Sequence, residues 1–463
     1  MIFRPWLALL MVVVASLPAA TLPNGFAETQ IATGLDPTSM AIAPDGRVFI
    51  AEKSGRIRVV VGDALLATPF ATLANVNNNN EAGLDGICLH PNFANNGWVY
   101  AFYCTTAPFT HNRVVRFTAA GNVAAGPPVA IFAFETYGNV HNGGAMHFGP
   151  DGNLYVATGD TGNGSFAQSM TSLQGKVIRI QDNGAIPSDN PFFNTTTGIY
   201  RAIWALGLRN PFTAAFQPGT GRFYVNDVGG SWSEEINLVT PGANFGWPTT
   251  EGYHSDARFA NPAYAYDHSQ GCAIAGGVFY PAASQFPASY AGRYFFADYC
   301  NRWVRTIDPA AANPASTVTT FATGLNRPVD LDVAPDGSLY YLARGGIGGG
   351  SIDDNTSSTS GTLWRIRHTA AQGPTIAAQP QGTTVSVGAS ATFSASASGS
   401  APLVYQWQRN GVDIAGATAT TYSIAATVLG DSGATFRAVV SNVAGSASSN
   451  TATLTVTAAA PVL

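Results

Sequence analysis

Charged side chains are scarce in this chain. Asp, Glu, Lys and Arg together make up 11% of its 463 residues, and the formal net charge is -5. Because nucleic-acid binding relies on a surplus of basic side chains, this charge argues against a nucleic-acid partner. Long apolar runs are missing beyond residue 20, so no membrane-spanning segment is expected in the mature chain. The four cysteines lack the close spacing of zinc ligands, which disfavours a four-thiolate metal site.

The first 20 residues have the pattern of an export signal. Arg4 precedes an apolar run from Trp6 to Val14, and the segment ends in the small residues Ala19 and Ala20. The run is too short to span a bilayer comfortably, and no cysteine near its end points to a lipid anchor. We therefore predict a signal peptide over residues 1–20 and a secreted or periplasmic protein.

Four cysteines in an exported chain predict disulfides. Cys88 and Cys104 flank two expected strands joined by an Asn/Gly turn, and Cys272 and Cys300 flank another strand pair. The sequence predicts Cys88 bonded to Cys104 and Cys272 bonded to Cys300.

A repeat organises the chain as far as His368. Each copy is an apolar strand, a Pro-Asp-Gly-type turn and a strand rich in Tyr, Phe and Val. The turn prolines are Pro44, Pro91, Pro150, Pro218 and Pro335, and a sixth copy fits between GGVFYP and GRYFFADYC. Six such units predict an all-β fold, a six-bladed β-propeller over residues 21–368.

The composition changes to Ala, Ser, Thr and Gly after His368. We predict a linker over residues 369–374 and an immunoglobulin-like β-sandwich over residues 375–457, based on YQWQRNG around Trp407 and DSGATFRAVVSNVAG from Asp431.

Cysteine is absent from both usual bridge positions of such a domain, where Ala395 and Ala438 stand. The core should therefore depend on Trp407, Phe393 and Phe436. A spacer, or a contact to carbohydrate, protein or a cell surface, is the expected role.

Three polar, glycine-containing strings lie between His141 and Trp247. The first, HNGGAMHFGPDGNLYVATGD, carries His141 and Asp160. If its two strands are neighbours, Asp160 can orient the imidazole and leave the other nitrogen as a general base. A hydrogen-bonded loop histidine is the simpler alternative.

The second string, WALGLRNP, supplies Arg209 and Asn210 before a proline that favours an extended strand end. Arg209 can neutralise a carboxylate or an oxyanion, or it can be a surface arginine. The third string, NDVGGSWSEEINLVTPGANFGWP, mixes carbonyl and carboxylate oxygens of the kind calcium prefers, or it is a solvated acidic loop.

Taken in order, these strings resemble the soluble glucose and sorbosone dehydrogenase family, which uses pyrroloquinoline quinone (PQQ). Further matching segments are EAGLDGICLHPNF, LQGKVIRI with IPSDNPF, and RPVDLDVAPDGSLYYLAR. The resemblance spans roughly Leu22 to His368 and also implies a six-bladed propeller.

The resemblance implies roles for individual residues. His141 takes the place of the catalytic base, Asp160 that of its orienting carboxylate, and Arg209 lies near the reducible carbonyl of the cofactor. Asn210, Glu81 and Arg327 are the other positions that it implies contact the cofactor.

The resemblance also implies two calcium ions. Val228, Gly229 and Gly230 correspond to residues that present oxygens to a calcium holding the cofactor. Glu235 and the backbone of Phe245 resemble ligands of a second, structural calcium.

Some positions depart from the family pattern. Cys300 or its neighbours replace a lysine that faces the cofactor's carboxylates, Val329 replaces the second of two arginines, and Gly230 replaces a proline. Because the cofactor carries several carboxylates, losing two cations is expected to weaken its binding.

The sequence therefore predicts a secreted quinoprotein that oxidises the anomeric carbon of an aldose or related sugar by hydride transfer to PQQ, with calcium, and passes electrons to an unidentified acceptor. Two alternatives stay open. One is a cofactor-free binding propeller like the hedgehog-interacting-protein-like proteins, and the weaker one is a calcium-dependent lactonase-type hydrolase.

Overall fold

The computed structural model describes residues 20–282, 285–345, 359–369, 373–399, 403–442 and 444–458. Its contacts separate two compact units, Met1–His368 and Thr369–Leu463. The predicted signal peptide, apart from Ala20, and the middle of the predicted linker lie outside the described residues.

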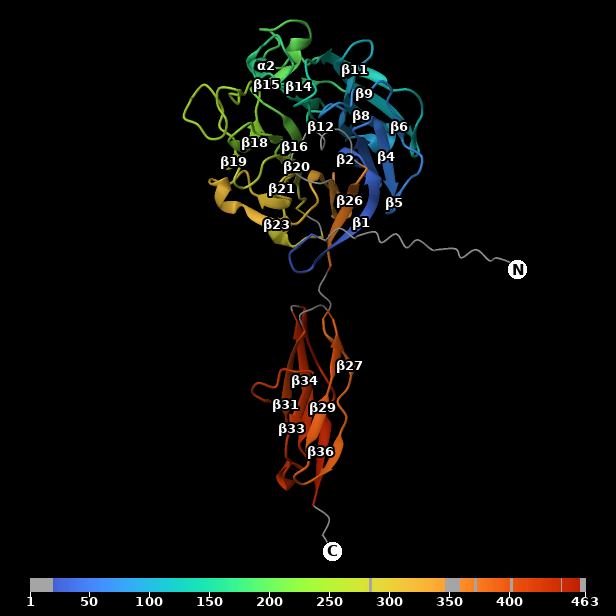
Figure 1. Cartoon of the computed structure of the whole chain (residues 1–463), viewed down its shortest axis with the longest axis vertical. Coiled ribbons are helices and arrows are strands. Elements are labelled where there is room, and N and C mark those ends of the chain that lie inside the picture. Colours follow the sequence, from blue (N-terminus) through green and yellow to red (C-terminus); the bar gives the residue numbers. More distant parts are fainter. Residues whose placement is uncertain are drawn as a thin grey trace, which may run out of the picture. The chain divides into compact units, whose positions relative to one another are not determined.

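The first unit is the predicted six-bladed β-propeller, which is confirmed. Six antiparallel sheets of four or five strands each contribute one inner strand to a central channel, and consecutive inner strands are in contact around the whole ring. Figure 1 shows the inner strands β2, β12, β16 and β20 near the middle of the unit and β5, β6, β19 and β23 toward its rim.

Each of the first three blades begins with its inner strand. The first contains β2 (Pro37–Ile42), β3 (Val48–Glu52), β4 (Arg56–Val61), β5 (Ala64–Leu65) and β6 (Ala71–Thr72). The second contains β7 (Leu84–Leu89), β8 (Trp98–Thr105), β9 (His111–Ala120), β10 (Val123–Ala124) and β11 (Val129–Glu135). The third contains β12 (Gly143–Phe148), β13 (Leu154–Thr158), β14 (Lys176–Ile180) and β15 (Ile203–Leu206).

The fourth blade contains β16 (Pro211–Phe216), β17 (Phe223–Asp227), β18 (Ser233–Val239) and β19 (Tyr264–Asp267). The fifth contains β20 (Ile274–Phe279), β21 (Tyr294–Asp298), β22 (Trp303–Ile307) and β23 (Thr319–Thr323). The sixth contains β24 (Pro328–Val333), β25 (Leu339–Ala343), β26 (Gly361–His368) and β1 (Phe26–Leu35). Helical turns are short: α1 (Phe93–Asn96), α2 (Ser165–Gln168), η1 (Gly198–Ala202), η2 (Ala288–Tyr290) and η3 (Pro314–Thr317).

The predicted repeat is the inner hairpin of each blade. Its proline turns join β2 to β3, β7 to β8, β12 to β13, β16 to β17 and β24 to β25, and the sixth copy spans β20 and β21. The second strands of the blades are buried along most of their length, which explains their run of Val, Phe, Tyr and Leu.

The ring closes through β1 and β26, which pair antiparallel from Phe26 opposite His368 to Leu35 opposite Gly361. A second connection joins β24 to β2 inside the channel. The Asp330 carboxylate accepts the Met40 N–H at 2.7 Å, and the Asp332 carboxylate accepts the Ile42 N–H at 3.0 Å.

This inner connection makes stability depend on pH. Burial, aided by the charge of Asp332, raises the pKa of Asp330 to about 7. Between about pH 4 and 7 the folded chain therefore keeps a proton that the unfolded chain has lost, so stability falls as pH rises through this range.

We expect Asp330→Asn to reduce the slope of unfolding free energy against pH by as much as about 1.4 kcal/mol per pH unit between pH 4.5 and 7. Urea titrations at several pH values in this range would measure the slope. Asp45→Asn is the control, since Arg47 lowers the pKa of that turn carboxyl. An unchanged slope in Asp330→Asn would contradict the assignment.

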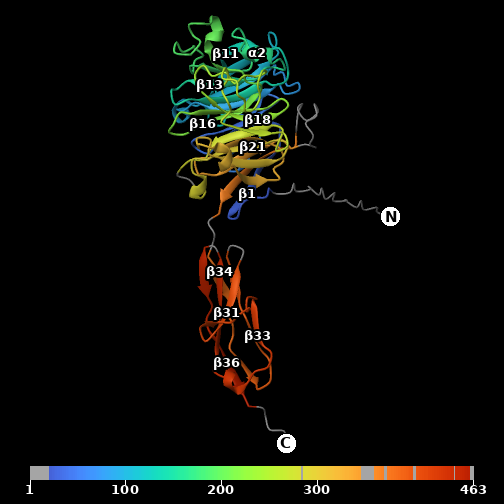
Figure 2. The same ribbon diagram turned by 90° about the vertical axis from the view of Figure 1, so that its left-hand side faces the viewer.

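The second unit is an immunoglobulin-like β-sandwich, and its strands run lengthwise in orange and red in Figures 1 and 2. One sheet contains β28 (Thr383–Ser386), β36 (Ala452–Thr457), β34 (Thr435–Asn442), β31 (Val404–Arg409), β32 (Val412–Asp413) and β35 (Gly445–Ser448). The other strands form two pairs, β29 (Ala391–Ser394) with β33 (Thr421–Ile424) and β27 (Thr375–Ala378) with β30 (Ser396–Ser398). The turn η5 (Leu429–Asp431) precedes β34.

Aromatic side chains form the core of this unit. Trp407, Phe393 and Phe436 are fully buried, and the rings of Phe393 and Phe436 stack with centroids 4.5 Å apart. Ala395 and Ala438 are buried in the same core, where neither can form a disulfide.

We expect Trp407→Ala to destabilise the second unit by about 3–5 kcal/mol, because it removes a fully buried ring and leaves a cavity. Calorimetry of the full chain should show the transition of this unit at a lower temperature and the propeller transition unchanged. Val412→Ala, at a side chain that is 71% exposed, is the control, and equal effects of the two variants would contradict the packing argument.

In the part of the chain that the structure describes, no helix has the length and apolar character needed to cross a bilayer.

Candidate active site

A cavity of about 460 Å³, lined by both charged and apolar side chains, occupies one end of the propeller channel. The first or second residue of each of the six inner strands lines it: Pro37, Asp85, Gly143, Phe212, Ile274 and Val329. A second cavity of about 450 Å³ is lined by later residues of the same strands, and none of the predicted site residues lines it. The first cavity brings together Glu81, His141, Arg209, Asn210 and the 228–230 segment.

His141 lies between a carboxylate and a guanidinium. Its Nδ1 is 2.7 Å from Asp160 Oδ1, and its Nε2 is 2.9 Å from Arg209 Nη2. Because Arg209 can only donate, Nε2 is the acceptor and the proton of a neutral imidazole is on Nδ1, which donates to Asp160. In this tautomer the Nε2 lone pair accepts from Arg209, which lines the cavity as His141 does.

Asp160 holds this arrangement rigidly. It is buried, and besides His141 it accepts hydrogen bonds from the Gly162 N–H at 2.7 Å and from Trp247 Nε1 at 2.8 Å. Burial opposes ionisation, but the hydrogen bonds, led by the one from His141, outweigh it and lower the pKa of Asp160. Asp160 is therefore a charged orienting group.

Local backbone geometry explains why glycines surround His141. The backbone of His141 has a φ of 50°, and a Cβ at Gly159 would lie 1.9 Å from the His141 carbonyl oxygen. At Gly144 the φ is 136°, and a Cβ would lie 2.7 Å from the Asp85 carbonyl oxygen. Glycine at both positions allows the His141 turn to pack tightly on β13 and β7.

Arg209 and Asn210 are held by Asp227 at the end of β17. The Asp227 carboxylate accepts the Arg209 N–H at 2.9 Å and the Asn210 N–H at 2.7 Å. Arg209 Nη1 donates to the Val228 carbonyl at 3.0 Å, and Asn210 Oδ1 accepts the Gly143 N–H at 3.1 Å. The guanidinium of Arg209 also lies over the Trp247 ring, 5.6 Å from its centroid.

The segment 228–230 lines the cavity beside Arg209, and a single carboxylate fastens the loop that follows it. The Glu251 carboxylate accepts backbone N–H groups of four consecutive residues, from Gly230 at 2.6 Å to Ser233 at 3.2 Å. The fixed loop keeps the backbone of this segment at the cavity wall, and backbone carbonyl oxygens are among the ligands that a hard cation such as calcium prefers.

Glu235 and Phe245 lie apart from the main cavity. They line a small space of about 10 Å³ together with Asp227 and Glu251. Burial raises the pKa of Glu235 to about 7, and burial together with the charge of Glu235 raises that of Asp227. Glu235 and Asp227 thus bring carboxyl oxygens, the donors that calcium prefers, to the same small space as Phe245.

Two predicted cofactor contacts differ in position. Glu81 lines the cavity, where its Oε2 accepts the His141 N–H at 2.6 Å, so it also supports the His141 backbone. Arg327 does not line the cavity. It is buried, donates to the Gly345 carbonyl at 3.2 Å and lies against the ring of Tyr299, which does line the cavity.

Among the cavity residues to which the sequence assigned no role are the charged or amide side chains of Lys53, Asp85, Asn142 and Arg344. All four are buried. Within the described residues, neither side-chain polar atom of Asn142 has a hydrogen-bond partner, and the same holds for Asp85 Oδ2. One signal was available, since Lys53 and Lys176 are the only two lysines in the sequence.

One predicted disulfide is confirmed and the other is wrong. Cys272 and Cys300 are bonded, with Cα atoms 5.7 Å apart, and both line the cavity. Cys88 and Cys104 are free and buried. In the β7–β8 hairpin Cys88 pairs with Tyr100, so Cys104 lies four residues, or about 13 Å, further along the strand.

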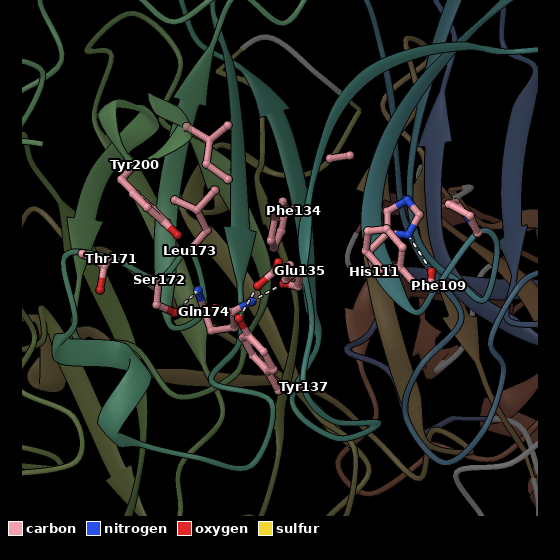
Figure 3. A pocket seen from close by; sticks show the side chains of 13 residues that line it. Phe109, His111, Phe134, Glu135, Tyr137, Thr171, Ser172, Leu173, Gln174 and Tyr200 are labelled. Carbon is pink, nitrogen blue, oxygen red and sulfur yellow. Dashed lines mark hydrogen bonds between the residues drawn. The ribbon is translucent and has the colours of Figure 1, made fainter. Parts of the chain in front are cut away.

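A third pocket, of about 360 Å³, lies outside the channel (Figure 3). Its polar groups bond to one another: Tyr137 Oη donates to Glu135, and Gln174 bridges Ser172 and the Glu135 carbonyl. None of the predicted site residues lines it.

Among the described residues, no group of three or more His, Cys, Asp and Glu side chains lies close enough together to hold a metal ion.

Comparison with known proteins assigns the class and then the family. The fold is that of propeller sugar dehydrogenases. A crystal structure from Thermus thermophilus, described as a putative oxidoreductase (glucose dehydrogenase), superposes with a TM-score of 0.64 and 29% identity, covering 74% of this chain and 99% of that one. Residues 35–349 match the glucose/sorbosone dehydrogenase family. The chain therefore belongs to this family, as its motifs indicated.

Two further relatives show the range of proteins that this chain resembles. HIPL2 protein of Arabidopsis thaliana is 28% identical over 442 residues, covering 74% of this chain and 63% of HIPL2. Quinoprotein glucose dehydrogenase B of Acinetobacter calcoaceticus is 29% identical over 259 residues, covering 50% of this chain and 53% of that protein. The chain thus spans less than two thirds of the length of each.

Proposed function

We propose that this protein is an exported quinoprotein that oxidises the anomeric carbon of an aldose or related sugar, with His141 as the general base. The observation that carries the proposal is the Asp160–His141–Arg209 alignment at a channel cavity, in a chain of the glucose/sorbosone dehydrogenase family.

The hydrogen bonds of His141 support one of its ring nitrogens as the proton acceptor. With Nδ1–H donating to Asp160, His141 Nε2 is the nitrogen that accepts the proton of the anomeric hydroxyl. Charged Asp160 stabilises the imidazolium that results. Arg209 donates to the same Nε2, so a bound sugar hydroxyl must displace that hydrogen bond before His141 can act.

Bound PQQ would supply the hydride acceptor: the anomeric carbon gives up a hydride and the anomeric hydroxyl gives up a proton to His141, so the sugar loses two electrons and two protons in total. The cavity suits such a group. A volume of about 460 Å³ lies in the range of cofactor sites, and Arg209, Lys53 and Arg344 offer positive charge to its carboxylates. The side chain of Asn142 supplies an amide without a partner among the described residues.

Arg209 would neutralise the oxygen that becomes negative on reduction, since it is already fixed by Asp227 and Val228 at the cavity wall. Backbone oxygens of Val228, Gly229 and Gly230 would hold a calcium ion near the cofactor, and Glu235 with the Phe245 carbonyl would hold a second. Asn210 and Glu81 would complete the cofactor contacts.

Export, domain roles and electron transfer belong to the same proposal. The 1–20 segment would be removed as a signal peptide, and residues 375–457 would act as a spacer or as a contact to carbohydrate or a cell surface, joined by the 369–374 linker. The electron acceptor is unidentified.

Titration of the signal-free protein with PQQ, with calcium and then with EDTA, tests the proposal. We expect saturable, calcium-dependent binding seen in the cofactor's absorbance, and dye reduction that depends on an added aldose. Absence of binding at high cofactor concentration would instead favour the cofactor-free binding propeller. Two uncharged residues at the cavity wall, Cys300 and Val329, point to that alternative.

A further inference from the structure

The cavity wall formed by the first and last blades carries two cations. Lys53 follows β3 directly, and Arg344 follows β25 directly. Both line the cavity although they are only 2% and 6% exposed. Both side chains therefore face this space from a largely water-excluded position, where charge-assisted hydrogen bonds to an anion are strong.

Arg344 reaches the cavity next to an uncharged position. Its N–H donates to the Arg327 carbonyl at 2.9 Å, so it leaves β25 beside the start of β24, the strand that carries Val329. Its guanidinium donates to the Pro37 carbonyl at 3.2 Å and lies 3.2 Å from Asp36, both in the first blade. The side chain is therefore held across the junction of the two blades.

Lys53 is positioned from the other side of this junction. Its N–H donates to the Asp36 carbonyl at 2.9 Å, and its Nζ donates to the Asn78 carbonyl at 2.5 Å. A Cβ at Gly83 would lie 2.7 Å from Lys53 Cγ, so glycine there lets the lysine stem pass toward the cavity. Lys176, by contrast, donates to three backbone carbonyls and does not line the cavity.

The charges around Lys53 and Arg344 favour the binding of an anion. Asp36, Asp85 and Glu81 are the acidic groups that act on Lys53, and the charge of Arg344 acts against it. Asp36 is already paired with Arg344, and Glu81 accepts the His141 N–H. Burial raises the pKa of Asp85 and lowers that of Lys53, each to about 8. The basic side chains that line the cavity, Lys53, Arg209 and Arg344, outnumber the lining carboxylates, Glu81 and Asp85.

We propose that Lys53 and Arg344 jointly bind carboxylate groups of the quinone cofactor, at the wall of the first and last blades where Val329 is uncharged. The inference rests on the proposed function and names the residues that give the cavity its affinity for an anionic cofactor. Both residues bind and position the cofactor, and neither takes part in the transfer of protons or hydride.

Equilibrium binding of PQQ to the calcium-loaded full chain, followed by quenching of tryptophan fluorescence, tests this without reference to turnover. We expect Lys53→Met and Arg344→Met each to raise Kd by about tenfold to a hundredfold, the range for one charge-assisted hydrogen bond. Lys53→Arg should keep most of the affinity. Arg258→Gln removes an exposed cation outside the cavity and is the matched control.

Amine labelling of the unaltered protein gives an independent result that does not depend on a variant folding. Because Lys53 and Lys176 are the only lysines, mass spectrometry of the acetylated Lys53 peptide reports on this one site. We expect saturating PQQ to slow its acetylation at least about fivefold, as expected for an ammonium group in a charge-assisted contact.

The outcomes separate the two proposals. If the unaltered protein does not bind PQQ, the proposed function fails and this inference falls with it. If the unaltered protein binds PQQ but Lys53→Met and Arg344→Met bind equally well, or acetylation of Lys53 is unchanged by PQQ, then only the assignment of these two cations is overturned.

Discussion

Replacement of His141 by alanine is expected to lower kcat of the PQQ- and calcium-loaded protein by about 10²–10⁴-fold, the usual contribution of a general base. Nε2 is the acceptor nitrogen beside the cavity, and alanine leaves nothing to take the proton of the anomeric hydroxyl. Binding of PQQ should weaken much less, because the cations that attract its carboxylates remain. Stopped-flow absorbance of the cofactor after mixing with sugar measures the step directly.

The control for this variant is His254→Gln. His254 does not line the cavity, and its ring contacts the Ala260 carbonyl at 3.3 Å. That variant should react at the rate of the unaltered protein. If His141→Ala kept more than about a tenth of the rate with the cofactor bound, His141 would not be the base.

Asp160→Asn is expected to lower kcat by about 10²–10⁴-fold, comparable with the loss when the orienting Asp of a serine protease is replaced by Asn. The carboxylate accepts from three donors, His141, Gly162 and Trp247. An amide nitrogen facing His141 would donate to Nδ1 and move the imidazole proton to Nε2, where the ring can no longer accept one. The base would be present in the wrong tautomer.

Other measurements distinguish a change of tautomer in Asp160→Asn from a loss of folded structure. The Kd for PQQ and the melting temperature should change little, and raising the pH should not restore the rate. Asp256→Asn, which alters an exposed carboxyl paired with Arg258, is the control. Full recovery of kcat at high pH would show that Asp160 acts by its charge alone.

The sequence predicted the fold because the repeat is local. Each Pro-Asp-Gly turn lies between strands only a few residues apart, so the turn and the alternating strands together define an inner hairpin. The His141–Asp160 pair could also be predicted from the sequence, because β12 and β13 form one hairpin in which Gly143 lies opposite Thr158. Register then places the residues beyond both strand ends side by side.

Hairpin register also explains the wrong disulfide. Cys88 lies near the turn of its hairpin and Cys104 at the far end of the partner strand, a difference that flanking positions in the sequence do not reveal. Cys272 and Cys300 lie beyond the ends of β20 and β21, where the pairing of Ile274 with Asp298 brings them together.

The positions of Lys53 and Arg344 in the cavity were not predicted, for a different reason. They lie far apart in the chain, in the first and sixth blades, and although Arg344 ends the matching segment RPVDLDVAPDGSLYYLAR, that segment alone does not show that this arginine faces the channel. The two side chains come close together only because the ring closes between these blades. The Asp330–Met40 and Arg344–Pro37 hydrogen bonds join the blades at this closure. Contacts made by closure are not local in sequence, so only the folded structure shows them.

The most direct test of the central claim is a single turnover without oxygen. Protein loaded with one PQQ and calcium is mixed with each of a panel of aldoses, and the cofactor's absorbance and the sugar product are followed together. The account predicts reduction of the cofactor by at least one aldose, with one lactone formed per cofactor and loss of the reaction in His141→Ala. A cofactor that binds but stays oxidised with every sugar, or that does not bind at all, would contradict it.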